Sequence, residues 1–402
     1  MPELLKLPKK VLVISSYAPP KANGGSKYLF NIFSNYTADS YCFLTSHKNF
    51  KSRESDSDFM LPCRYYFFDQ PSDKKKLSSR LLINLTKPFR VFLILKQALK
   101  VIRKERVELL MGVTDNGRMF ILTYLLSKIS GVPYCPWMVD LWRENNLSAG
   151  WKKIANYFEP ILFNQAALIF LSLPSFKYHY QDAYQRPANK LHVINACEIP
   201  EHYNISPKEN YRPSPPFHIV YVGSIYWAQE DNIINLIEAL NEIRDIDVCL
   251  DIYTSRPTEK ILALAEKSDK VNIKYADREK LIEIQSQASI LFLPLSLNMQ
   301  KNPVIRTAIP SKINEYLISG RPILIQAPVD SYLSKYARKN GFALVMNQNN
   351  KEELIMSIKK LLLDKDYTDN LAEAAQKIVT NSRNSIRNFR LLAELLDDLS
   401  VE

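Results

Sequence analysis

The sequence predicts an α/β protein of two domains, each a doubly wound parallel sheet with helices on both faces. Short apolar runs rich in β-branched residues alternate with segments of helical period along the whole chain, which is the pattern of repeated β-α units. The chain has 402 residues, more than one hydrophobic core of ordinary size accommodates. We therefore expect two Rossmann-like halves.

The expected strands fall in both halves of the chain. In the first half they are 10–15, 41–45, 64–68, 108–112, 134–139, 167–171 and 191–194, and in the second 218–223, 247–253, 271–275, 289–294, 322–326 and 342–345. Parallel strands place their carboxyl ends on one edge of the sheet, where doubly wound proteins bind their ligands. Candidate site residues are therefore sought directly after these runs.

A proline-rich polar segment separates the two halves. It contains Pro200, Pro207, Pro213, Pro215 and Pro216. We expect one domain over residues 1–200, a linker over 201–217 and a second domain over 218–380. Residues 381–402 have the apolar spacing of a helix, and we expect this helix to pack back towards the first domain.

The composition is that of an ordinary globular protein, with 46% hydrophobic and 24% charged residues. No apolar run reaches 18 residues and no secretion cleavage site follows the start, so we expect an unsecreted, cytoplasmic protein. The five cysteines are scattered without a C-x-x-C pair, which favours reduced thiols over a disulfide frame or a zinc site. None of the five histidines lies in a ligand motif. We expect no metal and no cofactor.

The positive charge is concentrated in the first half of the chain. Residues 1–200 hold 28 Lys and Arg against 15 Asp and Glu, a net charge of +13, whereas residues 201–402 have a net charge of −2. This asymmetry indicates an anionic partner for the first half: a membrane surface, a phosphorylated acceptor or nucleic acid.

Two glycines follow the first expected strand. Gly24 and Gly25 open a segment of helical period, and their small size lets a ligand approach the backbone while the helix end offers free N–H groups to an anion. The pattern is not G-x-G-x-x-G, and no acidic residue stands about 20 positions later as a dinucleotide would require. An ordinary glycine-containing turn is the alternative.

The most informative local segment is IPSKINEYLISGRPILIQAP, residues 309–328. Pro310 and Ser311 suit the start of a helix, which places Lys312 in its first turn and Glu315 one turn later, and Gly320 ends it. A lysine beside a helix N-terminus is suited to a diphosphate, and a carboxylate one turn deeper can accept both ribose hydroxyls. A solvated Lys–Glu pair is the alternative.

Several segments together resemble the glycosyltransferases of the GT-B fold, close to glycosyltransferase family 4. They are YAPPKANGG, VDLW, KLHVIN, IVYVGSIY, ADREKLIEIQSQASILFLPL and PSKINEYLISGRPIL, and they span nearly the whole chain. The resemblance implies that the first domain binds an acceptor, that the second binds a nucleotide-sugar donor, and that transfer retains the anomeric configuration. The donor is a substrate rather than a cofactor.

The resemblance also assigns candidate residues, with two departures from the family. Glu315 matches the second glutamate of the E-x7-E motif, which holds the ribose, but Thr307 stands where the first is expected. After Gly223, the family often has an arginine and a lysine on the diphosphate, whereas this chain has Ser224 and then WAQED, which contains no basic residue. Lys312 or Arg306 could supply the missing positive charge, and we prefer Lys312. Ser311, at the expected helix start beside Lys312, would also contact the diphosphate.

Asp140 matches an acidic position of the D-x-W segment found in some members of the family. It follows an expected strand of the first sheet, where a ligand would bind. The resemblance gives it a role in catalysis or in orienting the acceptor. The alternative is that Asp140 caps a helix beginning at Leu141.

The segment from Lys74 to Arg106 predicts contact with an anionic membrane. It has eleven Lys and Arg against the single acid Glu105. In a helix that starts near Pro88, one face carries Val91, Leu95, Ala98, Leu99 and Ile102 and should pack on the sheet. The acceptor or membrane face combines basic and apolar residues: Phe89, Arg90, Leu93, Lys96 and Lys100. A solvated basic helix is the alternative.

The sequence thus predicts a retaining glycosyltransferase that uses a glycan or lipid-linked acceptor. A sugar-nucleotide epimerase of the same fold is one alternative. A non-catalytic membrane or nucleic-acid binding module is another, because Thr307 replaces the expected glutamate. Nucleic acid is disfavoured, since the basic residues are not interleaved with stacking aromatic residues in a known motif.

Overall fold

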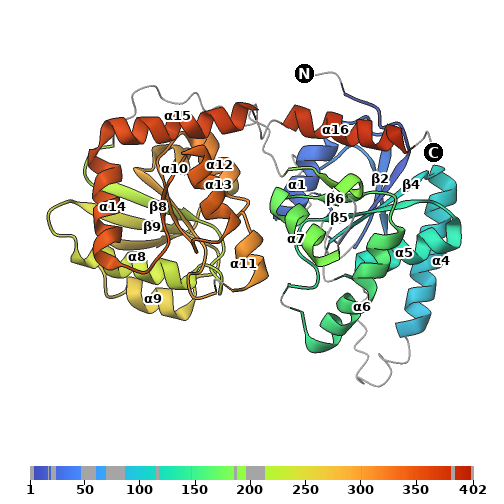
Figure 1. The fold of residues 1–402 in the computed structure, drawn as a ribbon, viewed down its shortest axis with the longest axis horizontal. Coiled ribbons are helices and arrows are strands. Elements are labelled where there is room, and N and C mark those ends of the chain that lie inside the picture. The colour runs from blue at the N-terminus through green and yellow to red at the C-terminus, as the bar shows by residue number, and fades with distance from the viewer. Residues whose placement is uncertain are drawn as a thin grey trace. The chain divides into compact units, whose positions relative to one another are not determined.

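The structure is a computed structural model, and it describes residues 4–16, 18–19, 24–46, 60–68, 87–114, 117–145, 147–184, 188–195, 213–299, 301–381 and 385–399. The chain forms two compact units. The first comprises Met1–Cys197 together with Ser385–Glu402, and the second comprises Glu198–Asn384. Each unit is an α/β body built on one sheet, as Figure 1 shows.

The first unit contains a seven-stranded sheet of order β3-β2-β1-β4-β5-β6-β7 in which all the paired strands are parallel. The strands are β1 (Val11–Ile14), β2 (Tyr41–Thr45), β3 (Arg64–Phe67), β4 (Leu109–Val113), β5 (Tyr134–Met138), β6 (Ile169–Leu171) and β7 (Leu191–Val193). The helices are α1 (Gly24–Phe33), α4 (Lys87–Glu105), α5 (Arg118–Ser130), α6 (Ala149–Gln165), α7 (Pro174–Tyr184) and α16 (Ser385–Asp398), with a 3-10 turn at Ala188–Lys190.

The last helix contributes to the core of the first unit. Phe389, Leu392 and Leu396 of α16 are buried in the same cluster as Val11 and Val13 of β1. The ring of Phe389 lies edge-on to that of Tyr36, with 6.2 Å between the centroids, and the Tyr36 hydroxyl donates to the Phe389 carbonyl oxygen. Helix α16 also contacts α1. Its apolar stripe is therefore buried against the segment that follows the first strand.

The other face of this sheet is covered closely by α5. Gly112 on β4 lies under this helix, and a Cβ atom there would be 2.6 Å from the Thr123 hydroxyl oxygen. Only glycine allows the helix to approach this near. The sheet is consequently covered on both faces, which explains why its central strands are apolar at successive positions rather than at alternate ones.

The second unit contains a six-stranded parallel sheet of order β10-β9-β8-β11-β12-β13. Its strands are β8 (Phe217–Val222), β9 (Val248–Tyr253), β10 (Val271–Lys274), β11 (Ile290–Pro294), β12 (Ile323–Gln326) and β13 (Leu344–Met346). Its helices are α8 (Glu230–Glu242), α9 (Glu259–Ala265), α10 (Arg278–Gln287), α11 (Pro303–Thr307), α12 (Ile313–Ser319), α13 (Tyr332–Asn340), α14 (Lys351–Leu363) and α15 (Lys365–Asn381). Figure 1 shows α8 and α9 on one side of β8 and β9, with α10 and α12 on the other.

The prediction of two doubly wound parallel sheets is confirmed. Every strand expected from the sequence is present, with its ends displaced by two residues or fewer. The four described cysteines, Cys42, Cys63, Cys135 and Cys249, are free thiols.

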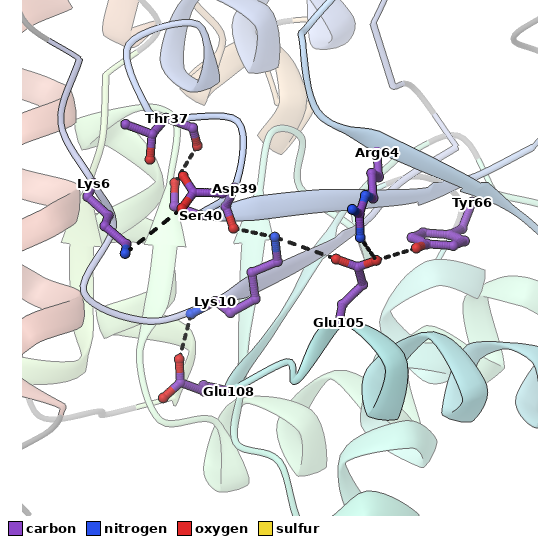
Figure 2. Close-up of polar contacts among 9 residues, drawn as sticks. All are labelled: Lys6, Lys10, Thr37, Asp39, Ser40, Arg64, Tyr66, Glu105 and Glu108. Carbon is purple, nitrogen blue, oxygen red and sulfur yellow. Dashed lines mark hydrogen bonds and ion pairs between the residues drawn. The ribbon is translucent and has the colours of Figure 1, made fainter.

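One buried carboxylate ties together three elements of the first unit. The Glu105 side chain, at the end of α4, is only 4% exposed, and it accepts hydrogen bonds from Arg64 (2.9 Å) and from the Tyr66 hydroxyl on β3. The Lys10 ammonium, just before β1, lies 3.6 Å from the second carboxylate oxygen. Figure 2 shows these side chains converging on Glu105. Burial alone would raise the pKa of Glu105, but the hydrogen bonds from Tyr66 and Arg64 and the nearby positive charges hold it below its usual value.

Replacing this carboxylate should destabilise the protein in a pH-dependent way. We expect Glu105→Gln to lower the free energy of unfolding by about 1–3 kcal/mol near neutral pH, since charge-assisted hydrogen bonds to a buried group are lost. The lowered pKa means that this stability is present above the unfolded carboxyl pKa of about 4.3 and is lost as the pH falls through the lower, folded value. Urea unfolding at about pH 7 and about pH 3 measures both effects.

The matched control is Glu394→Gln, because Glu394 is exposed on α16. It should change stability little at either pH. A Glu105→Gln protein as stable as the parent near neutral pH would contradict a stabilising role for this carboxylate.

Candidate functional site

In the second unit, the strand order reverses between β8 and β11. The chain continues from β8 outward to β9 and β10, and then returns to place β11 on the other side of β8. Ligands of doubly wound sheets bind outside the carboxyl ends of the strands at such a point. Gly223 directly follows β8, and the loop that begins at Leu295 directly follows β11. The candidate site is therefore centred on these two strand ends.

A buried amide holds the strand ends together. Asn232 on α8 is fully buried, and its side chain donates to the carbonyl oxygens of Leu295 (2.9 Å) and Gln326 (2.6 Å), which lie at the ends of β11 and β12. The preceding Asp231 accepts from the Ser296 hydroxyl at 2.7 Å. The carboxyl edge is thus fixed by polar contacts to one helix.

Helix α12 begins later than the sequence predicts. Residues 310–312 form a turn, in which Ile313 N–H donates to the Pro310 carbonyl at 3.0 Å, and the first bond of α-helical spacing runs from Tyr316 to Lys312. Lys312 is therefore the N-cap rather than a first-turn residue, and Glu315 lies in the first turn. The end of the helix at Gly320, with φ 66°, is as predicted.

The start of α12 is attached to the end of β8. The amide of Val222 donates to the Tyr316 hydroxyl at 3.2 Å, and Tyr316 is fully buried. This contact positions the neighbouring Glu315 and Lys312 near the strand end. Gly223 has φ 127°, and a Cβ atom there would lie 3.0 Å from the Lys312 ammonium nitrogen. The glycine thus serves both the backbone conformation and the close approach of Lys312.

Lys312 lies in an unusual environment for an ammonium group. Its nitrogen lies 3.9 Å from the centre of the Tyr221 ring, where it makes a cation–π contact. Burial lowers the pKa of Lys312 to about 7, although the negative charge of Glu315 acts in the opposite direction. Part of the residue reaches solvent, but the ammonium itself lies against Tyr221 and Gly223. An anion at this position would restore its full charge.

Glu315 is half-buried and is oriented by a buried partner. The side chain of Gln285 on α10 donates to its carboxylate at 3.0 Å, and Gln285 is only 1% exposed. An amide donor keeps one carboxylate oxygen fixed without neutralising the charge. The carboxylate can therefore accept further hydrogen bonds in a set direction.

The other expected donor-site residues are placed as follows. Ser224 is exposed, and its carbonyl oxygen accepts from Tyr221 at 2.7 Å. Ser311 is exposed in the turn before α12. Arg306 is exposed in the last turn of α11, and the Thr307 hydroxyl donates to the Pro303 carbonyl at 2.8 Å within that helix. The structure thus brings Gly223, Lys312 and Glu315 together, whereas Arg306 and Thr307 belong to a separate short helix.

In the first unit, Gly24 and Gly25 begin α1 after β1, and Asp140 follows β5. Asp140 is exposed, and the backbone before it is held from both sides, since Val139 donates to Thr114 (3.1 Å) and accepts from Ser172 (3.2 Å). The alternative of an N-cap is wrong, because no helix starts at Leu141. The next helix, α6, begins at Ala149 with Ser148 before it, and Leu141 and Trp142 are buried instead.

The loop that carries Asp140 also bears a charged cluster that the sequence did not reveal. Glu144 lies 3.2 Å from the ring nitrogen of His179 on α7, and Arg143 lies 3.8 Å from the buried Glu159 of α6. Burial would raise the pKa of Glu144, but His179 and Arg143 hold it below its usual value. The sequence did not predict a role for His179, because its partner Glu144 lies in a loop 35 positions earlier in the chain.

Helix α4 differs from its predicted orientation. Its buried face consists of Ala98, Val101 and Ile102, whereas Val91, expected against the sheet, is 47% exposed. Among the described side chains of α4, the fully buried apolar ones lie in its carboxyl-terminal half. Phe92 (59% exposed) and Leu93 (46%) are exposed as well, and Lys96 and Lys100 are exposed. The side chains of Phe89 and Arg90 lie outside the described residues. Within the described ranges, none of the helices has the length and apolar content needed to cross a bilayer.

The comparisons with known proteins rest on structure alone. No protein-family model matches the chain, and no curated protein matches it in sequence. Solved structures match over nearly its full length. A glycosyltransferase from Rickettsia africae ESF-5 has a TM-score of 0.68 and 15% identity and covers 97% of this chain and 98% of its own.

Two further structures are similar to the same degree. HepE of Anabaena, in complex with UDP-glucose, has a TM-score of 0.69 and 14% identity and covers 97% of this chain and 100% of its own. Sucrose-phosphate synthase from Thermosynechococcus elongatus has a TM-score of 0.69 and 14% identity, with coverages of 97% and 99%. At these identities the likeness establishes the fold: the chain has two Rossmann-like domains of the GT-B type.

Proposed function

We propose that the protein is a retaining glycosyltransferase that moves a sugar from a nucleotide-sugar donor to an acceptor. The observation that carries the proposal is the meeting of Gly223, Lys312 and Glu315 at the carboxyl end of β8. A glycine without a side chain, an ammonium and an oriented carboxylate suit the diphosphate and the ribose of such a donor. The shared fold of HepE, which binds UDP-glucose, supports the same assignment.

Lys312 is the group that would assist departure of the nucleoside diphosphate. Negative charge grows on the leaving phosphate as the glycosidic bond breaks, and a partly desolvated ammonium stabilises that charge more strongly than one in water. We assign no divalent ion to this step, because Lys312 would supply its positive charge. Retention would follow from attack on the same face of the sugar, with the leaving phosphate accepting the proton of the acceptor hydroxyl.

Asp140 would orient the acceptor in the first unit. Asp140 lies at a strand end, and the backbone of Val139 just before it is held by Thr114 and Ser172. Both properties suit a group that accepts a hydrogen bond from a sugar hydroxyl. The nearby pair of Glu144 and His179 adds polar groups to the same loop region.

We further propose that the acceptor is lipid-linked and that α4 rests on the inner surface of a membrane in the cytoplasm. The support is the exposure of Val91, Phe92 and Leu93 beside Lys96 and Lys100. Apolar side chains flanked by cations suit the headgroup region of an anionic leaflet, where each Lys or Arg contributes about 1 kcal/mol.

A nucleotide screen followed by an activity assay tests the whole proposal. One nucleoside diphosphate should raise the melting temperature more than the others, as expected for a ligand that binds only the folded state. Incubation of the matching sugar nucleotide with glycan or lipid-linked acceptors should then yield a glycoside with retained configuration. Release of an epimerised sugar without any acceptor would support the epimerase instead, and stabilisation by no nucleotide would contradict both.

Removing the charge of Glu315 should weaken nucleotide binding. We expect Glu315→Gln to cost about 1–3 kcal/mol in the binding of the nucleoside diphosphate, because a charged acceptor becomes a neutral amide. Calorimetric titration measures the loss. Glu283→Gln, an exposed position on the neighbouring α10, is the control and should bind as the parent does. Equal affinities for the two variants would remove Glu315 from the site.

Lys312→Ala should lower kcat more than it weakens donor binding, since its charge matters chiefly as the phosphate departs. The pKa of about 7 adds a pH dependence. Lys312 is charged below that pH, so kcat/KM of the parent should decline as the pH rises through about 7, and this decline should be absent in the variant. Lys335→Ala, at an exposed position, should retain the parent profile. Identical profiles for Lys312→Ala and the parent would show that Lys312 does not act in the reaction.

Asp140→Asn should reduce transfer by at least about tenfold while leaving nucleotide affinity unchanged, because the residue lies in the unit assigned to the acceptor. Initial rates at varied acceptor concentration, together with a nucleotide titration, separate the two effects. Asp182→Asn, an exposed position on α7, should match the parent. Full transfer activity in Asp140→Asn would reject the assignment.

Vesicle co-sedimentation tests the membrane contact. The parent should bind vesicles that contain anionic lipid, and binding should weaken as added salt shortens the Debye length from about 8 Å. The double variant Phe92→Ser, Leu93→Ser should bind less, whereas Met356→Ser, Leu363→Ser, which removes exposed apolar groups of α14, should not. If the parent ignores anionic vesicles at low salt, a soluble acceptor explains the basic first half better.

A further inference from the structure

One face of the second sheet is polar near its edge. Side chains alternate along a strand, so the apolar residues Ile219, Leu250 and Ile252 point into the core while their neighbours point to the other face. That other face carries His218 on β8, Cys249 and Asp251 on β9, and Asn272 and Lys274 on β10. The strand pairing places these residues side by side, since His218 is opposite Cys249 and Asp251 is opposite Asn272.

Three potential metal ligands converge in this patch. The Nδ1 atom of His218 lies 2.9 Å from an Asp251 carboxylate oxygen and 3.2 Å from the Cys249 sulfur. The three ligand atoms all lie within 4.8 Å of one another. In a tetrahedral zinc site, ligand atoms are about 3.3–3.6 Å apart, as bond lengths of about 2.0–2.3 Å require. The two distances from His218 Nδ1 would have to lengthen by a few tenths of an ångström, and the sulfur and carboxylate oxygen, within 4.8 Å of each other, would have to close by up to about 1 Å to admit the ion.

A catalytic triad does not explain this arrangement. In a triad, one ring nitrogen of the histidine faces the nucleophile and the other faces the carboxylate. Here both Cys249 and Asp251 approach the same nitrogen, Nδ1. A single ring nitrogen either donates or accepts one hydrogen bond, so it cannot serve both neighbours fully. A metal ion at the point of convergence would satisfy all three groups at once.

The carboxylate is already oriented for such a role. Its other oxygen, Oδ1, accepts from Asn272 at 2.9 Å and pairs with the Lys274 ammonium at 2.8 Å, which leaves Oδ2 directed at His218. Outer partners of this kind fix the ligands of natural metal sites. Lys274 also offsets part of the Asp251 charge, so the site would bind more weakly than a structural zinc site with several thiolates.

We propose that His218, Cys249 and Asp251 form a binding site for a thiophilic divalent cation such as Zn²⁺. One nitrogen, one sulfur and one oxygen ligand suit Zn²⁺, and the sulfur disfavours Mg²⁺ and Ca²⁺. The His218 side chain is 40% exposed, so water can complete the coordination. His218 and Cys249 lie near the amino ends of β8 and β9 and Asp251 lies just past the middle of β9, whereas the donor site proposed above follows the carboxyl end of β8 at Gly223. The ion would therefore link two strands and take no part in sugar transfer.

The sequence does not reveal this cluster. The three residues come from two strands, with His218 separated from Cys249 by 31 positions and from Asp251 by 33. No short ligand spacing marks them, and the expectation of no metal rested on that lack of spacing. Only the parallel pairing of β8 with β9 brings them together.

Titration of chelator-treated protein with Zn²⁺ tests the proposal. We expect one ion to bind with an affinity that falls by more than about tenfold in Cys249→Ser and in Asp251→Asn. Cys63→Ser, which alters a free thiol of the first unit, is the matched control and should bind as the parent does. Equal Zn²⁺ affinity in the parent and in Cys249→Ser would overturn the site.

A second measurement uses only the parent protein, and so does not depend on the folding of a variant. Co²⁺ bound at the site should give the sulfur-to-metal charge-transfer absorption of a thiolate complex, and Zn²⁺ should displace it. Zn²⁺ should also raise the melting temperature. A Co²⁺ complex without thiolate absorption would overturn the assignment of Cys249. Nucleotide affinity should be the same with and without Zn²⁺, so the outcome is independent of the proposed transferase activity.

Discussion

Parallel strand pairing is the constraint on which the rest of this structure depends. In each unit the strands run in one direction, so each return passes through a helix or loop and all the carboxyl ends meet on one edge. In the second unit, that edge gathers Gly223, Leu295 and Gln326, which span about 100 positions of the chain. The amino ends, by contrast, carry structural contacts such as the Glu105 network. The position of the ligand edge is thus a consequence of topology.

The chemistry of the proposed donor site depends on how tightly α12 approaches β8. The hydrogen bond from Val222 to Tyr316 attaches the helix to the strand, and the absence of a side chain at Gly223 leaves room for the Lys312 ammonium. The same closeness removes water from that ammonium and lowers its pKa. The packing of α12 against the end of β8 therefore sets both the position and the pKa of the Lys312 ammonium. A change in this packing would alter both.

The sequence predicted the parts of this structure that depend on local pattern. Runs such as 41–45 and 248–253 are mostly apolar and rich in β-branched or aromatic residues, and such residues favour the pleated, buried surface of a strand. The start of α12 was missed because Pro310 and Ser311 suit a helix start and a tight turn equally well. The burial of α4 was misjudged because periodicity identifies an apolar face but not how far along the helix the neighbouring elements extend.

The candidate sites divide in the same way. Glu315 and Gly320 were found because they belong to one contiguous motif, and resemblance gave Glu315 its role. The contacts of Glu315 with Gln285, of Glu144 with His179 and of His218 with Cys249 join residues about 30 positions apart. Such contacts can be predicted only once the order of the strands in the sheet is known. In the sequence alone, no short motif with a fixed number of residues between the partners marks these pairs.

The return of α16 to the first unit affects how the chain can fold during synthesis. Residues 385–398 supply Phe389, Leu392 and Leu396 to a core whose other members are made nearly 200 residues or more earlier. The second unit is continuous along the chain, whereas the first lacks part of its apolar interior until α16 has left the ribosome. A nascent chain therefore carries an open apolar surface beside α1 while the second unit is being made. Chaperone binding during translation would be directed at that surface.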